Sequence, residues 1–271
     1  MSRDAATHRW LLAAVLAGAL AGLGGCASQI GGAGASASGQ AASSSEADIQ
    51  RRARLRLELA VTYLESGNLP VAMEEANQAL ATDPGYADAY HVRGLVYMAQ
   101  QDLAHAETDL KRAQGMKPND PDIQQNLGWL LCQRGQYAQA NALFERALAA
   151  PGYLQRSRTF LSQGMCHQRA GQLAEAEQAV LHAYEIDAGN PLVGYHLASI
   201  IFARGDAQRA RFYVRRINNS EAANAESLWL GVKIERALKD LVAMRQLGDQ
   251  LQRRFPQSRQ TLALERGAFD E

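Results

Sequence analysis

An internal repeat constrains the fold of this chain more than any other feature of its sequence. From residue 51 onward, six small residues recur at nearly equal intervals, and an alanine follows each of them by twelve residues. The six pairs are Ala60 and Ala72, Gly94 and Ala106, Gly128 and Ala140, Gly164 and Ala176, Ala198 and Ala210, and Gly231 and Ala243. Small residues at a fixed spacing allow two helices to cross closely, because a larger side chain would force the backbones apart. Each unit is therefore predicted to be a pair of helices packed at these positions.

Turn signals support the same division of the chain. Gly67, Gly135, Gly171 and Gly205 fall between the paired helices, where residues that end a helix are expected. The pattern resembles the tetratricopeptide repeat, a helix-turn-helix unit of about 34 residues. Because such units stack on one continuous core, residues 51–271 are predicted to form one all-α, right-handed superhelical solenoid with a C-terminal capping helix. About six repeats are expected, at residues 53–86, 87–120, 121–156, 157–190, 191–223 and 224–256, with the capping helix around 258–269.

Residues 1–25 are predicted to be a lipoprotein signal peptide. Residues 10–23 form an uncharged apolar run of fourteen residues, whereas a membrane-spanning helix needs about 20 residues. The run ends in Leu23-Gly24-Gly25-Cys26, which resembles a lipobox, the site where the thiol is acylated and the chain is cut before the cysteine. Cys26 is therefore predicted to be the lipidated first residue of the mature protein, modified with palmitate or a similar acyl chain. The alternative is a plain secretory peptide with an incidental cysteine.

The segment 26–50 is predicted to be the lipidated cysteine and a disordered linker. It is rich in Ala, Ser, Gly and Gln and shows no apolar period, so burial cannot offset the entropy of ordering it. Ala27 follows the cysteine; an Asp there would suggest retention at the inner membrane. The expected location is therefore the periplasmic face of the outer membrane.

Net charge excludes two classes of partner. The chain carries 28 basic and 28 acidic residues, and cleavage before Cys26 would leave 26 and 27, a net charge near −1. This balance argues against nucleic acid, which attracts a basic surface, and against electrostatic attachment to anionic lipid. Membrane attachment is therefore expected through the acyl chains at Cys26.

No catalytic or metal-binding constellation is visible in the sequence. The six histidines form neither a His-Glu-x-x-His pair nor a zinc-finger spacing with cysteine. Cys166 and His167 are adjacent, but neighbouring residues on a helix point about 100° apart, which suits a nucleophile and its base poorly. We therefore expect no enzyme activity, no cofactor and no metal site.

The predicted binding surface is the concave face, lined mainly by the first helix of each unit. An apolar groove with aromatic anchors suits an amphipathic or extended partner segment. The alternative is that several of these residues only pack between helices. Trp129 is the strongest candidate, because Gly128 beside it already occupies the tight helix crossing. The inward positions are Leu57, Val61, His91, Leu95, Met98, Gln125, Trp129, Leu161, Met165, Tyr195, Phe202, Leu228 and Val232.

A closer family resemblance lies in the sequence Asn-Leu-Gly-Trp-Leu-Leu-Cys at residues 126–132 and in residues 230–238 and 250–258. These stretches, and the order of lipobox, low-complexity segment, six repeats and Phe-Pro-x-Ser, resemble the type IV pilus biogenesis lipoproteins of the PilF/PilW family. The resemblance implies an outer-membrane pilotin that binds the pilus secretin and assists its assembly, pilus formation and twitching motility. We expect a monomer. The alternative is another periplasmic envelope-assembly adaptor, for outer-membrane protein insertion or for a peptidoglycan enzyme.

Cys132 and Cys166 are candidates for a disulfide. They are separated by one repeat length and lie on the first helices of consecutive units, where facing side chains can meet. The expected compartment is oxidising, and the family resemblance also points to a bridge between the third and fourth units. The alternative is a pair of buried thiols that act as small apolar residues.

Overall fold

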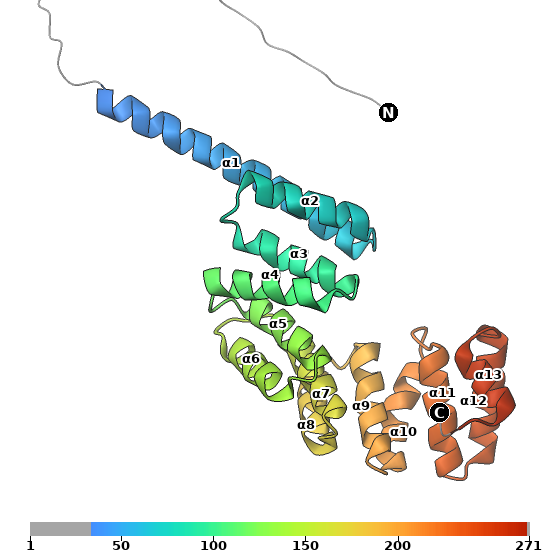
Figure 1. The fold of residues 1–271 in the computed structure, drawn as a ribbon. Helices are drawn as coiled ribbons and strands as arrows, with labels where there is room; N and C mark the ends of the chain where they lie inside the picture. The colour runs from blue at the N-terminus through green and yellow to red at the C-terminus, as the bar shows by residue number, and fades with distance from the viewer. Residues whose placement is uncertain (1–33, 270–271) are drawn as a thin grey trace, which may run out of the picture. The chain divides into compact units, whose positions relative to one another are not determined.

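The computed structural model describes residues 34–269, and every regular element in that range is an α-helix (Figure 1). The predicted signal peptide and Cys26 lie outside the described residues. The chain divides into two units, residues 1–45 and 46–271, and the first helix runs across the boundary. The helices are α1 (Gly34–Glu65), α2 (Leu69–Thr82), α3 (Ala87–Ala99), α4 (Leu103–Met116), α5 (Pro121–Gln133), α6 (Tyr137–Ala149), α7 (Arg156–Arg169), α8 (Leu173–Ile186), α9 (Pro191–Ala203), α10 (Ala207–Asn218), α11 (Ala225–Ala237), α12 (Leu241–Arg254) and α13 (Arg259–Arg266).

The helices pair as the repeat predicted. Each of the six predicted units contains two helices, and α13 follows them as the capping helix. The turn inside a unit ends its first helix with a residue in the left-handed conformation, which favours glycine. Four units use glycine there, whereas Gln101 and Lys239 adopt φ of 63° and 61° in the second and sixth units. The predicted all-α superhelical repeat fold is confirmed.

The start of α1 corrects one prediction. Residues 26–50 were expected to be a disordered linker, but within the described residues the chain is helical from Gly34 onward. Four alanines between residues 35 and 42 explain this, because alanine has the highest intrinsic helix propensity. Extending the helix of the first repeat also avoids the cost of forming a new helix nucleus.

The small residues pack as predicted in most units, and the structure adds a partner that the sequence analysis missed. A Cβ placed on Gly128 would lie 3.2 Å from the backbone oxygen of Ala140 and 3.0 Å from a ring carbon of Phe144. In each of the four units with glycine at the helix crossing, a large apolar residue sixteen positions later packs against that glycine. These partners are Leu110, Phe144, Val180 and Leu247.

The sixth unit departs from this pattern. A Cβ on Gly231 would lie 2.7 Å from the Asn218 side-chain nitrogen and 3.0 Å from Leu247. Ala243 is only half-buried, whereas the alanines of the other five pairs are fully buried. The crossing of the sixth pair therefore depends on Asn218 of the fifth unit as well as on its own second helix.

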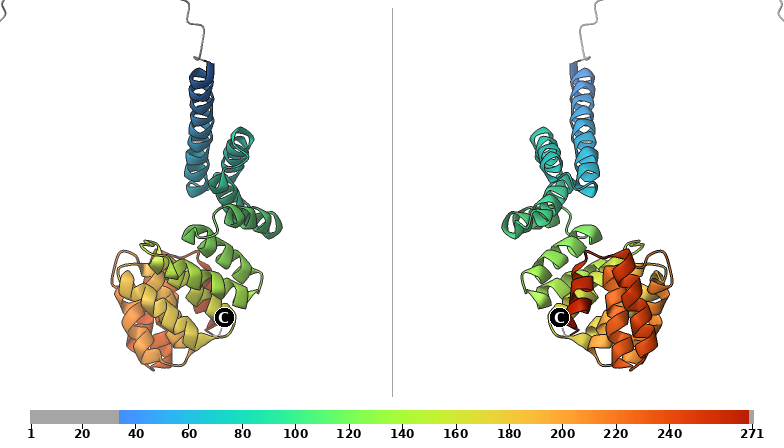
Figure 2. Two further views of the ribbon diagram at one scale, coloured as in Figure 1. Left: turned by 90° about the vertical axis from the view of Figure 1, so that its left-hand side faces the viewer. Right: turned by 90° about the vertical axis from the view of Figure 1, so that its right-hand side faces the viewer.

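The first helices form the inner layer of the stack. Successive first helices contact one another from α3 to α11, whereas no second helix contacts the next second helix in the described part of the chain. The helix pairs change direction along the stack: α3 and α4 lie across the view of Figure 1, whereas α9 to α12 run up and down it, and Figure 2 shows the same stack from two further sides. The first helices therefore form the layer that the sequence analysis assigns to the concave face.

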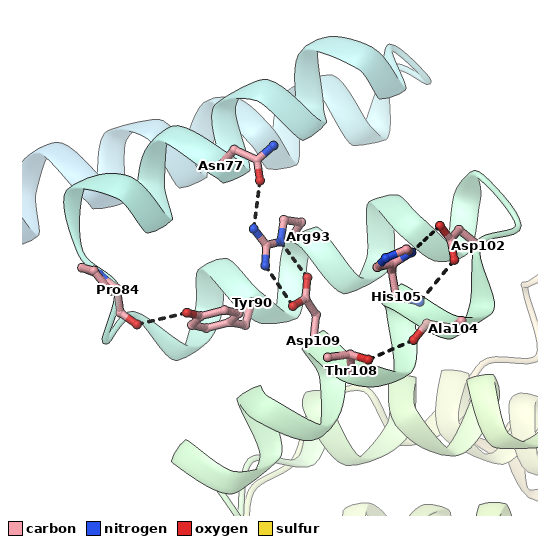
Figure 3. A network of polar contacts seen from close by, with 9 residues as sticks. All are labelled: Asn77, Pro84, Tyr90, Arg93, Asp102, Ala104, His105, Thr108 and Asp109. Atoms are coloured by element: carbon pink, nitrogen blue, oxygen red, sulfur yellow. Dashed lines mark hydrogen bonds and ion pairs between the residues drawn. The ribbon is translucent and has the colours of Figure 1, made fainter.

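Polar contacts join neighbouring units at the back of this inner layer. Arg93 on α3 donates from Nε to Asp109 Oδ2 at 2.7 Å and from Nη2 to Asp109 Oδ1 at 3.0 Å (Figure 3). Its remaining nitrogen donates to Asn77 Oδ1 on α2 at 2.9 Å. Asp109 is buried, and a buried carboxylate needs such a partner to offset its desolvation. One arginine therefore holds three helices of two units.

A second type of ion pair repeats between units. Glu107 pairs with Arg134, and Glu177 pairs with Arg204. In both pairs the glutamate lies near the start of a second helix, and the arginine ends the first helix of the next unit. Another contact between units reverses this order: the buried Glu235 on α11 accepts from Arg211 and Arg215 of α10, the second helix of the preceding unit.

Cys132 and Cys166 form a disulfide in the structure. The bond joins α5 to α7, with 5.7 Å between the two Cα atoms. Both cysteines are buried beside Leu131 and Ala140 in one apolar cluster. The bridge therefore fastens the first helices of the third and fourth units from inside the core.

The close approach at Gly164 yields a stability prediction. Gly164→Ala would place its Cβ 3.0 Å from the Ala176 backbone oxygen and against Val180, so we expect a loss of about 1–3 kcal/mol from overpacking. Gly115→Ala is the matched control, because nothing lies within 4 Å of its added Cβ. It should leave stability equal or raise it by about 0.5–1 kcal/mol through helix propensity. Urea unfolding measures both, and an unchanged Gly164→Ala midpoint would contradict the packing.

The disulfide yields a second prediction. A bridge between cysteines with a sequence separation of 34 should contribute on the order of 3–4 kcal/mol. Freshly isolated protein should therefore expose neither Cys132 nor Cys166 to a thiol reagent under denaturing, non-reducing conditions. Reductant should lower its melting temperature, whereas the Cys132→Ala/Cys166→Ala variant should not respond to reductant. Two reactive thiols from these positions would contradict the bridge.

Candidate protein-binding surface

The inner layer presents eight of the thirteen predicted groove residues as half-buried side chains. They come from the first helices of units one to five and therefore belong to the inner layer. These residues are Val61, His91, Leu95, Met98, Trp129, Met165, Tyr195 and Phe202. Part of each side chain remains accessible, and most are apolar or aromatic. This row, called the inner row below, is the part of the predicted groove that a partner could touch.

The other five predicted groove residues are buried. Leu228 and Val232 are 0% exposed, because they pack with Trp229 and Leu251 in the last core cluster. Leu57 and Leu161 belong to the core clusters of their own units, and Gln125 is 2% exposed. For these five positions, packing between helices is the better interpretation. The sequence pattern could not separate the two roles, since both place an apolar residue on the same side of a helix.

Trp129 lies in the inner row, but its ring already has a neighbour. The guanidinium carbon of Arg169 is 5.3 Å from the centre of the Trp129 ring, within the range of a cation–π contact. Arg169 ends α7, one unit further along the chain. A partner that stacks on this face of Trp129 would therefore have to displace Arg169 or contact it as well. The sequence analysis did not identify the contact between Arg169 and Trp129.

A polar network interrupts the inner row at its middle. The Asn126 side-chain nitrogen donates to His91 Nε2 at 2.8 Å, and Arg158 donates to Asn126 Oδ1 at 3.2 Å. The three residues come from α3, α5 and α7, and therefore from three consecutive units. Hydrogen-bond donors and acceptors here would set the register of an apolar partner. Asn126 and Arg158 were missed because no periodic pattern marks two polar residues that lie on different units.

Burial lowers the pKa of His91 from its ordinary value of 6.5, although Asp120, Asp122 and Asp88 act in the opposite direction. The network agrees with a neutral ring, because the amide nitrogen of Asn126 needs an acceptor and Asn126 Oδ1 accepts from Arg158. A proton on Nε2 would face another donor. The network is therefore sensitive to acid.

The described residues show no site for a metal ion. Within residues 34–269, no group of three or more His, Cys, Asp or Glu side chains is placed to hold one. In the same range, no helix combines the length and apolar character required to cross a bilayer. The disulfide also removes the Cys166 thiol from any nucleophilic role.

The low pKa of His91 predicts an acid-sensitive stability. The unfolded chain protonates this histidine near pH 6.5, whereas the folded chain does so only at lower pH. The unfolded state then binds more protons, so stability should fall as pH falls below about 6.5. In His91→Gln, the drop in melting temperature between pH 7.5 and 5.5 should become smaller. His182→Gln, at an exposed histidine, is the control and should keep the full drop. An equal drop in both variants would contradict the assignment.

Comparison with known proteins agrees with this architecture. Models of the tetratricopeptide repeat match residues 40–121 and 126–191, and a further one matches residues 97–151. The type IV pilus assembly protein PilF of Pseudomonas aeruginosa is 24% identical over 202 residues, which cover 74% of this chain and 80% of that protein.

Solved structures show the same relationship. PilW, described as a widely conserved type IV pilus biogenesis factor, superposes with a TM-score of 0.74 and 28% identity, covering 78% of this chain and 97% of that one. PilF of Pseudomonas aeruginosa superposes with a TM-score of 0.70 and 22% identity over 81% of this chain and 99% of that one. The chain therefore belongs to the tetratricopeptide repeat family, in which it is homologous to the type IV pilus proteins PilF and PilW.

Proposed function

We propose that this protein is a pilotin-type scaffold that assists the assembly of the type IV pilus secretin by binding protein and not by catalysis. The observation that carries the proposal is the likeness to PilW, because it spans nearly the whole of that pilus biogenesis factor at 28% identity. The match to PilF over most of both chains supports the same process.

The inner row is the proposed contact surface for the secretin subunit. Its half-buried apolar and aromatic side chains suit an amphipathic or extended segment. The polar network of His91, Asn126 and Arg158 offers a fixed hydrogen-bonding point within it. A surface of this kind binds through burial at a few anchors, with the polar contacts setting register.

Attachment to the outer membrane is proposed through acyl chains on Cys26, with the repeats facing the periplasm. The sequence Leu23-Gly24-Gly25-Cys26 supports this. The charge balance leaves acylation as the main source of membrane affinity, since each buried CH₂ contributes about 0.8 kcal/mol.

A second candidate is another adaptor for envelope assembly. Lipopolysaccharide assembly protein B of Escherichia coli is 29% identical over 130 residues, which cover 48% of this chain and 33% of that protein. This match is restricted to part of both chains, so it supports the shared repeat more than a shared role. Normal secretin assembly in a strain lacking the protein would favour this candidate.

The test is complementation of a deletion strain, with secretin multimers and surface pili as the readouts. The deletion should lower both, and the wild-type chain should restore them. Leu95→Glu, in the inner row, should restore neither although the protein stays folded, because it places a charge on the apolar surface. Leu154→Glu is the matched control at a position 89% exposed in the loop before α7, and it should restore both.

The same strain tests the anchor. Cys26→Ser should abolish incorporation of labelled palmitate and release the protein from the outer-membrane fraction. A Cys26→Ser protein that stays acylated and membrane-bound would contradict the anchor. Equal secretin multimers with and without the wild-type chain would contradict the pilotin role.

A further inference from the structure

One aromatic contact lies outside the predicted groove and is made by the segment after the last helix. α13 ends at Gly267, whose φ of 66° reverses the chain. The turn is held by hydrogen bonds from Gly267 N to Leu264 O at 3.1 Å and from Ala268 N to Ala263 O at 2.9 Å. It brings Phe269 back onto α11.

The Phe269 ring lies between an indole and a guanidinium group. Its centroid is 5.4 Å from the Trp229 ring centroid at an interplanar angle of 22°, and the guanidinium carbon of Arg236 lies 4.2 Å from the Phe269 centroid. Trp229 is only 6% exposed with Phe269 in place. Phe269 is therefore held by stacking on Trp229 and by a cation–π contact with Arg236.

Trp229 and Arg236 form a slot that Phe269 occupies, and further space lies beside it. A pocket of about 330 Å³ continues beside the ring, lined by Phe202, Lys233, Arg236, Ala237 and Phe269. Phe202 belongs to α9 and also to the inner row, so the pocket is bordered by the first helices of the fifth and sixth units. Phe269 itself is half-buried and packs against the last core cluster, as Leu247, Phe255 and Leu264 do.

The chemistry of the slot defines its ligand. The stacking surface selects an aromatic side chain, and the two basic residues of the pocket favour carboxylates next to it. The chain's own sequence carries Asp270 and Glu271 directly after Phe269. We propose that the Trp229–Arg236 slot is a recognition site for an aromatic residue flanked by acidic residues in a partner protein, and that Phe269 occupies it as an internal competitor.

This site shares Phe202 with the proposed contact surface for the secretin, whereas Trp229 and Arg236 lie outside that surface. The proposal for this site is based on contacts in the fifth and sixth units, and it does not depend on the identity of the pilus partner. An internal segment held by a short turn has a high effective concentration, so it should weaken an external ligand without abolishing binding.

The test uses the full chain and a fluorescein-labelled peptide of sequence Gly-Ala-Phe-Asp-Glu. Phe269→Ala should bind the peptide at least about tenfold more tightly than wild type, because the competitor is removed. Phe212→Ala is the matched control, at a phenylalanine 66% exposed on α10, and it should bind like wild type. A peptide with Ala for Phe should not bind, and one with Asn-Gln for Asp-Glu should bind more weakly. Adding Arg236→Gln to Phe269→Ala should reverse most of the gain.

Equal peptide affinity for Phe269→Ala and wild type would overturn the proposal. Phe269→Leu provides a second variant that keeps apolar volume against Trp229, and it should also bind the peptide more tightly than wild type. Loss of the helical circular dichroism in both variants would assign Phe269 to the core and overturn the site. A wild-type dimer that the peptide dissociates would identify a second copy as the occupant and also contradict the proposal.

Discussion

The close approach of two helices at a residue with little or no side chain is the constraint on which the rest of this structure depends. At Gly94, Gly128 and Gly164, an added Cβ would meet the second helix within 3.0 Å or less. That approach lets the large residue sixteen positions later lie over the glycine, and it fixes how the two helices cross. Because the crossing recurs once in each repeat, the units stack in one register. The first helices then form the inner layer, and the surface of that layer is what a partner can reach.

Contacts between units convert the repeated pairs into one body. The disulfide joins units three and four inside the core, while Glu107 and Glu177 pair with arginines of the following unit. The His91 network spans three units from the concave side. In a solenoid, stability is the sum of each unit and its neighbouring interfaces, so these contacts also fix the geometry of the inner row. Stability and the geometry of the proposed contact surface are therefore coupled at His91, where protonation would disturb both.

The fold could be predicted because its signals are local and periodic. Glycine at the crossing and glycine in the turn each have one physical reason, and both repeat with the unit. The linker prediction failed from Gly34 onward because composition alone does not show that a helix next to an alanine-rich segment can extend into it. For the residues predicted to line the groove, periodicity gives the face of the helix but not the depth of the side chain. Both Leu228 and Phe202 were predicted to line the groove, but Leu228 is buried, whereas Phe202 is partly accessible. The contact of Phe269 with Trp229 joins two distant positions with no repeat behind them, so only the structure shows it.

A double-mutant cycle at Gly94 and Leu110 tests the central constraint most directly. The only close obstacle to a Cβ on Gly94 is the Leu110 side chain, at 2.9 Å, while the nearest backbone atom is at 3.4 Å. Gly94→Ala alone should cost about 1–3 kcal/mol by overpacking, and Leu110→Ala alone about 2–5 kcal/mol by leaving a cavity. In the double variant the new methyl enters the space that Leu110 leaves, so the loss should be smaller than the sum by about 0.5–3 kcal/mol. Additive losses of unfolding free energy would show that the Leu110 side chain is not the reason why position 94 requires glycine. That result would contradict the account of how each helix pair is held.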